Sequence, residues 1–210
     1  MTRLPLIIAA ALVAAVTNAP AAQADPMCPA GGAPPGSASK PYDGGTVWIS
    51  PDGLVGVSTA EGNGRVRVPS ASPMPLQAMV IDAQANGQQQ LIVSDGRVAH
   101  LFALTGCTIS AVYDGQGQPF LFDLQNLRGN GTGIGCSDLG DGPRLVGLQA
   151  LPDGAGYTVR RTAIDLDGSA ATIGRSDTVP GTSQQDPVVA WAMTISCGER
   201  TMTQDGVQQP

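Results

Sequence analysis

Short runs of β-forming residues, each cut off by a glycine-containing turn, are the feature that most limits what this chain can fold into. Thr46 to Ser50 is followed by Pro51-Asp52-Gly53, and a second run, Leu54 to Ser58, follows at once. Two such runs joined by three residues that contain Asp-Gly predict a β-hairpin. The arrangement recurs along the chain, whose 28 glycines and 17 prolines also disfavour helices. The sequence therefore predicts an all-β fold.

The first residues carry the pattern of an export signal. Arg3 precedes the apolar run Leu4 to Val16, and Ala22-Gln23-Ala24 follows as a small-x-small cleavage site. The run is shorter than the about 18 to 20 apolar residues that span a bilayer. We expect cleavage after Ala24 and a secreted or extracytoplasmic product with no integral membrane segment; a signal retained as an anchor is the alternative.

Composition divides the rest of the chain. Pro, Gly, Ala and Ser dominate its start, where too little apolar area is available to offset the entropy of ordering. The predicted parts are a signal peptide (1–24), a flexible lead-in (25–41), a single all-β domain (42–198) and a polar tail (199–210).

The charge balance excludes some partners. The formal net charge is −6, and Lys40 is the only lysine. Nucleic acids and anionic lipids need clustered Lys and Arg, so neither is expected as a partner.

Four cysteines in an exported chain favour two disulfides over metal or redox chemistry, and none of them forms a C-x-x-C pair. Three connectivities are possible. We predict Cys107–Cys136, which would tie the end of one repeated unit to the next, and Cys28–Cys197, which would clamp the two ends of the domain. That clamp would also allow Trp48, near the start, to pack against Trp191, near the end.

A strand-turn-strand unit is repeated. Asp138-Leu139-Gly140-Asp141-Gly142 leads into the apolar strand from Leu145, as Asp82 leads into Leu91-Ile92-Val93. These stretches resemble the FG-GAP or VCBS-type repeats of exported bacterial proteins and integrin-like propellers. The resemblance implies a small β-propeller-like array of four-stranded meanders. Complete propellers need at least about four blades, however, so a β-sandwich or barrel is the alternative.

The same resemblance implies calcium, since the aspartate loops of that family often hold it. Asp138 and Asp141 are the candidate ligands. A Ca²⁺ ion takes about six to eight oxygens, and Pro143-Arg144-Leu145 offers no downstream acidic ligand. The alternative is that the aspartates stabilise turns through hydrogen bonds to the backbone.

Catalytic patterns are missing from the sequence. His100 is the only histidine, and its alternating surroundings are typical of a half-buried strand. There is no G-x-S-x-G elbow, H-E-x-x-H helix or glycine-rich phosphate loop. No catalytic or cofactor-binding residue is therefore assigned.

These patterns favour an exported, monomeric, non-catalytic β-protein. Its role would be binding or structural, at the cell envelope or outside the cell, with an unknown protein or glycan partner. The alternatives are a calcium-stabilised adhesion module and a secreted hydrolase that uses an aspartate pair, which would need two carboxylates across one cleft.

Overall fold

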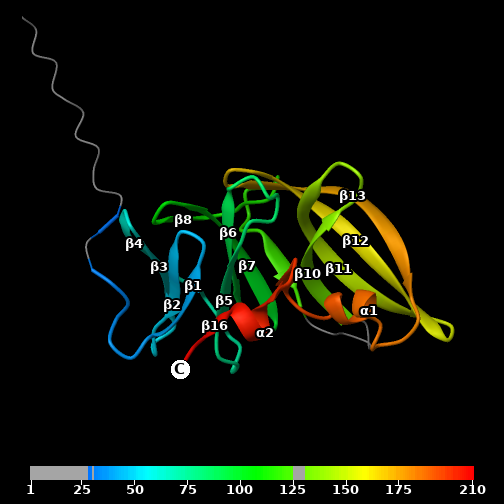
Figure 1. Cartoon of the computed structure of the whole chain (residues 1–210), viewed down its shortest axis with the longest axis horizontal. Coiled ribbons are helices and arrows are strands. Elements are labelled where there is room, and N and C mark those ends of the chain that lie inside the picture. The colour runs from blue at the N-terminus through cyan, green and yellow to red at the C-terminus, as the bar shows by residue number, and fades with distance from the viewer. Residues whose placement is uncertain (1–27, 30, 125–130) are drawn as a thin grey trace, which may run out of the picture.

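Three antiparallel sheets stand next to one another in chain order (Figure 1). The computed structural model describes residues 28–29, 31–124 and 131–210, so the predicted signal peptide lies outside the described residues. The first sheet is a meander in the order β1-β2-β3-β4. Its strands are β1 (Ala38–Tyr42), β2 (Gly45–Ile49), β3 (Leu54–Thr59) and β4 (Gly62–Arg67).

The middle sheet has six strands in the order β16-β5-β6-β7-β8, and β9 also pairs with β7. The first half of β7 pairs with β9 and its second half with β8, so one long strand supports two short ones. The strands are β5 (Gln77–Ile81), β6 (Gln89–Ser94), β7 (Val98–Thr105), β8 (Thr108–Ala111), β9 (Leu121–Asp123) and β16 (Val207–Gln208).

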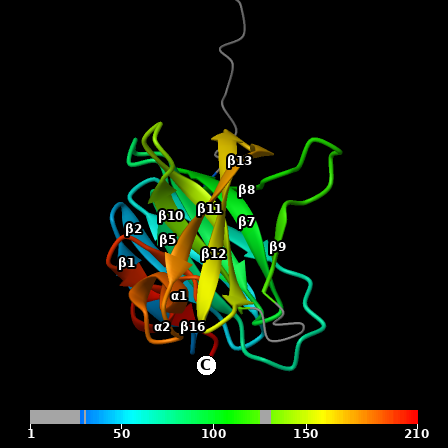
Figure 2. The same cartoon turned by 90° about the vertical axis from the view of Figure 1, so that its right-hand side faces the viewer.

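The third sheet is a meander of longer strands in the order β10-β11-β12-β13. Figure 2 looks onto this sheet, with the other two behind it. A β-bulge between Thr162 and Ile164 shifts the register of β12 against β13. The strands are β10 (Gly131–Asp138), β11 (Pro143–Asp153), β12 (Gly156–Asp167) and β13 (Ala170–Gly181).

The middle sheet is apolar on both faces because it has a neighbouring sheet on each. Alternate residues of a strand point to opposite faces. Leu91 and Val93 of β6 accordingly join the core shared with Val55 of the first sheet. Ile92, between them, joins the core shared with Leu145 of the third sheet. The uninterrupted run Leu91-Ile92-Val93 is thus the signature of a strand covered on both sides.

The C-terminal segment returns to the middle sheet, and the predicted boundaries change at both ends of the chain. The segment 199–210 is not a separate polar tail: Met202 and Val207 are buried, and β16 pairs with β5. At the other end, β1 begins at Ala38, inside the segment expected to be a flexible lead-in. The C-terminal elements are α1 (Pro187–Trp191), β14 (Ser196–Cys197), β15 (Arg200–Thr201) and α2 (Met202–Asp205).

The helix α1 lies at the start of the apolar stretch 188–196, although the sequence predicts an all-β fold. Asp186 caps the helix by accepting a hydrogen bond from the Val188 N–H, and Pro187 stands at its first position. Trp191 at its end is 56% exposed, whereas Trp48 is buried. The expected packing of the two tryptophans is therefore wrong.

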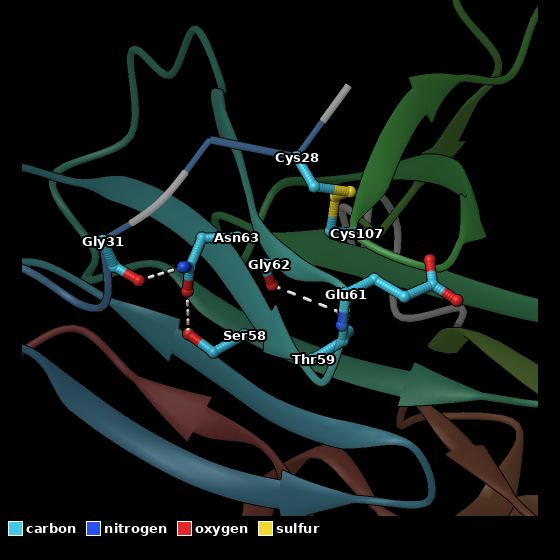
Figure 3. Close-up of a disulfide and its surroundings, with 8 residues drawn as sticks. All are labelled: Cys28, Gly31, Ser58, Thr59, Glu61, Gly62, Asn63 and Cys107. Atoms are coloured by element: carbon cyan, nitrogen blue, oxygen red, sulfur yellow. Dashed lines mark hydrogen bonds between the residues drawn. A yellow bond between two sulfur atoms is a disulfide. The ribbon is translucent and has the colours of Figure 1, made fainter. Parts of the chain in front are cut away.

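The predicted disulfide pairing is also wrong. The bonds are Cys28–Cys107, with 5.8 Å between the Cα atoms, and Cys136–Cys197, with 4.8 Å. Residues ahead of the first sheet lie along β4, where Cys28 contacts Gly62, and β4 lies against the turn that holds Cys107 (Figure 3). The packing of the sheets against one another therefore determines that Cys28 bonds to Cys107. The two bonds are compatible with an extracytoplasmic location.

The predicted fold class is confirmed: the protein is all-β, with antiparallel four-stranded meanders, and no sheet formed by the described residues closes into a barrel. This arrangement fits both the propeller-like and the sandwich expectation. Neither helix among the described residues is long and apolar enough to cross a membrane.

Candidate functional site

A cavity of about 570 Å³ opens where three segments that are far apart in the sequence meet. The β1–β2 turn forms one side, the end of β5 and the turn after it form another, and the β14–β15 hairpin forms the third. We call this cavity the inter-sheet cleft. Its lining residues are Tyr42, Asp43, Val80, Ile81, Asp82, Gly87, Gln89, Cys197, Glu199 and Arg200.

The cleft combines an apolar wall with a polar rim. Val80 and Ile81, both buried, form part of the wall. Three carboxylates, those of Asp43, Asp82 and Glu199, line the same cavity as Arg200, the only basic side chain in it. Such a lining suits a ligand that presents hydrogen-bond donors together with some apolar surface.

Tyr42 is the most unusual residue of the cleft. It is only 9% exposed, and its buried hydroxyl has no hydrogen-bond partner among the described residues. Burial raises the pKa of Tyr42 above its ordinary value. A second cavity of about 230 Å³ borders the same tyrosine and shares Val80 and Arg200 with the cleft. Tyr42 therefore lies between two hollows, in an environment that leaves its polar atom unsatisfied.

The turn from Asp82 to Gln88 builds one wall and is held by its own side chains. The Asp82 carboxylate accepts hydrogen bonds from the backbone N–H of Asn86 (3.2 Å) and of Gly87 (2.8 Å). The Asn86 side-chain oxygen accepts one from the N–H of Gln88 at 2.9 Å. Asp and Asn commonly organise turns in this way. One wall of the cleft is thus a loop of defined shape.

A side-chain contact and a covalent bond fix the other walls. The Gln89 amide of the middle sheet donates a hydrogen bond to the Asp43 carbonyl of the first sheet. The disulfide Cys136–Cys197 ties the β14–β15 hairpin to the third sheet. The shape of the cleft is therefore set by all three sheets.

The predicted metal residues lie elsewhere, at the β10–β11 turn. Asp138 accepts hydrogen bonds from the N–H groups of Gly140 (2.6 Å) and Gly142 (3.0 Å), which lower its pKa. Asp141 faces arginines instead: its carboxylate lies 3.8 Å from the Arg144 guanidinium and 3.4 Å from that of Arg175. These contacts match turn stabilisation, the alternative that the sequence left open.

No group of three or more His, Cys, Asp or Glu side chains that could hold a metal ion occurs in the described part of the chain. Calcium binding by Asp138 and Asp141 stays a prediction.

His100 lies on β7, as its sequence pattern indicated. It is partly buried, and its Nε2 atom is buried without a hydrogen-bond partner among the described residues. Burial lowers the pKa of His100, and the negative charge of Asp95 opposes that shift. The imidazole therefore sits in surroundings that favour its neutral form.

Sequence reasoning did not identify most of the cleft. It singled out Asp82 as part of a repeat, but it gave no role to Tyr42, Gln89 or Glu199. Glu199 fell in the expected tail, and Tyr42 marked only the expected start of the domain. No local pattern joins these residues, because the pairing of β16 with β5 and the disulfide to β14 bring them together.

Comparison with family models, with curated proteins and with solved structures gives no match for this chain. The class that the fold defines is an all-β protein of packed antiparallel meanders. The resemblance to FG-GAP or VCBS-type repeats stays a prediction from the sequence.

Proposed function

We propose that this chain is an exported, non-catalytic β-protein that binds a ligand in the inter-sheet cleft. The observation that carries the proposal is the convergence of three distant segments on one cavity with an apolar wall and a polar rim. Ligand sites are commonly concave and largely preformed, with volumes of about 300 to 1,000 Å³. The cleft has this character.

A glycan segment or a short peptide is the ligand class that we propose. Carboxylate and amide oxygens accept hydrogen bonds from sugar hydroxyls and from peptide N–H groups. Asp43, Gln89 and Glu199 supply such oxygens around the cleft, and Arg200 supplies donors. The predicted signal peptide and the two disulfides support a ligand at the cell envelope or outside the cell.

Binding to a panel of oligosaccharides and peptides tests the proposal, followed by calorimetric titration of the best binder. Glu199→Gln and Asp43→Asn should each weaken its affinity about tenfold or more, the equivalent of about 1.4 kcal/mol. Asp167→Asn is the matched control, because Asp167 is an exposed carboxylate at the β12–β13 turn, outside the cleft. Equal affinities for all four proteins would place the ligand elsewhere.

A hydrolase is the second candidate, and one observation favours it: three carboxylates line one cavity. A glycoside hydrolase needs one carboxyl group as acid and another as base or nucleophile. Asp82 is engaged by two backbone N–H groups, so Asp43 and Glu199 are the pair to test. Turnover of aryl glycosides that both Asp43→Asn and Glu199→Gln abolish would favour this function over simple binding.

A further inference from the structure

The turn between β5 and β6 contains an Asn-Gly pair in an unusual backbone. Asn86 and Gly87 are exposed, and Gly87 adopts a φ of 83°. Ala85, just before them, has a φ of 50° and is the only non-glycine residue with positive φ among the described residues. Apart from its two chain neighbours, no residue comes within 4 Å of the position that a Cβ on Gly87 would occupy. The turn is therefore open to solvent at Gly87, and no other segment packs against its Cα on that side.

Two hydrogen bonds around this pair would assist a cyclisation. The Gly87 N–H donates to the Asp82 carboxylate at 2.8 Å, so a base lies within hydrogen-bond distance of the proton that the attacking nitrogen must lose. The Gln88 N–H donates to the Asn86 side-chain oxygen at 2.9 Å. That donor polarises the amide carbonyl and stabilises the negative charge that develops on its oxygen.

We propose that Asn86 is a self-catalysed deamidation site. The Gly87 nitrogen forms a bond to Cγ of Asn86 as its proton passes to Asp82. The Cγ–Nδ2 bond then breaks, the proton returns from Asp82 to the departing nitrogen, and ammonia leaves behind a five-membered succinimide. Water adds to one of the two ring carbonyls and opens the ring to aspartate or isoaspartate at position 86. No oxidant or reductant is needed.

Of the three Asn-Gly pairs in the sequence, Asn63-Gly64 serves as an internal control. Asn63 and Gly64 lie in the paired strand β4, where Gly64 is opposite Val57. The Asn63 side chain donates to the Gly31 carbonyl and accepts from the Ser58 hydroxyl (Figure 3). The extended, paired backbone of β4 and the hydrogen bond that holds the leaving Nδ2 group to Gly31 oppose ring closure, so Asn63 should persist in the folded protein.

Deamidation would add a carboxylate next to the wall of the inter-sheet cleft, because Asp82 and Gly87 both line it. The isoaspartate product would also insert an extra main-chain atom into the turn. The proposal does not depend on the ligand of the cleft, since the chemistry involves only this turn and water.

Peptide mapping by mass spectrometry tests the proposal on the folded full chain, incubated at mildly alkaline pH. Tryptic cleavage after Arg65 and Arg67 separates Asn63 from Asn86. The peptide 68–97 should gain the mass difference between a hydroxyl and an amino group, located at position 86 by fragmentation. The Asn63 peptide should remain unchanged. After reduction and unfolding, Asn63 and Asn86 should convert at similar rates.

Asp82→Asn isolates the role of the base. It keeps the shape of the side chain but removes the carboxylate, and the conversion should slow about a hundredfold, as for the loss of a general base. An unchanged circular dichroism spectrum would show that this variant folds. If Asn63 converts as fast as Asn86 in the folded protein, or if Asp82→Asn converts at the wild-type rate or faster, the proposal is wrong.

Discussion

Replacing Tyr42 with phenylalanine should stabilise the fold, although tyrosine to phenylalanine changes at buried sites usually do the opposite. The Tyr42 hydroxyl is buried and has no hydrogen-bond partner among the described residues. Burying an uncompensated hydroxyl costs about 1 to 3 kcal/mol in protein mutational data. The phenyl ring would keep its packing in the core between the first and middle sheets and would remove this cost. For a chain of this size, each kcal/mol raises the thermal midpoint by about 2 to 4 °C.

Urea unfolding with the disulfides intact gives the free-energy difference directly. Tyr113→Phe is the control: Tyr113 is 44% exposed, and its substitution should change the free energy of unfolding by less than about 0.5 kcal/mol. A Tyr42→Phe variant that is less stable than the wild type by about 1 kcal/mol or more would refute the reasoning, because the hydroxyl must then have a partner.

Alkaline pH supplies an independent measurement of the same environment. Burial raises the pKa of Tyr42 in the folded state above its ordinary value of 10.0. Ionisation of Tyr42 therefore leaves the free energy of unfolding unchanged below pH 10.0. The free energy of unfolding falls as the pH rises from 10.0 through the folded-state pKa, because the unfolded state ionises more readily. Tyr42→Phe should remove this part of the pH dependence and leave the rest of the alkaline profile unchanged.

Three further predictions concern other parts of the fold. Replacing both Cys28 and Cys107 with serine removes a disulfide that closes a loop with a sequence separation of 79. In the chain-entropy model the free energy of unfolding should fall by up to about 4.5 kcal/mol, as measured by urea unfolding. A fall of less than about 1 kcal/mol would contradict this prediction. The neutral form of His100 is favoured by burial, so stability should fall as the pH drops below 6.5 and through the lower folded-state pKa, and His100→Gln should flatten that slope in thermal scans. Asp138→Ala should lower the thermal midpoint because the N–H groups of Gly140 and Gly142 lose their acceptor. Excess calcium should leave the thermal midpoint of the chelator-treated wild type unchanged. A rise with calcium would instead support the ligand role of Asp138 and Asp141.

Local sequence determined most of the strands and turns. At Pro51-Asp52-Gly53 the glycine adopts a φ of 77°. The runs on either side of this turn form β2 and β3, which pair with each other as the Asp-Gly signal indicates. Asp138 likewise organises its own turn. The helix α1 was missed although its signal is local: the Asp186 cap and Pro187 stand directly before an apolar run that is also compatible with a strand.

Tertiary structure decided the features that no short pattern contains. The sequence limits the four cysteines to three pairings, but only the packing of β4 against the Cys107 turn brings Cys28 to its partner. The same holds for the cleft: Tyr42 and Glu199 are separated by most of the chain and line one cavity because the C-terminal segment returns to β5. Turn formation depends on the backbone preferences of a few adjacent residues, which the sequence states directly. The meeting of distant surfaces depends on how whole sheets bury their apolar faces, and many sequences of strands are compatible with several such arrangements.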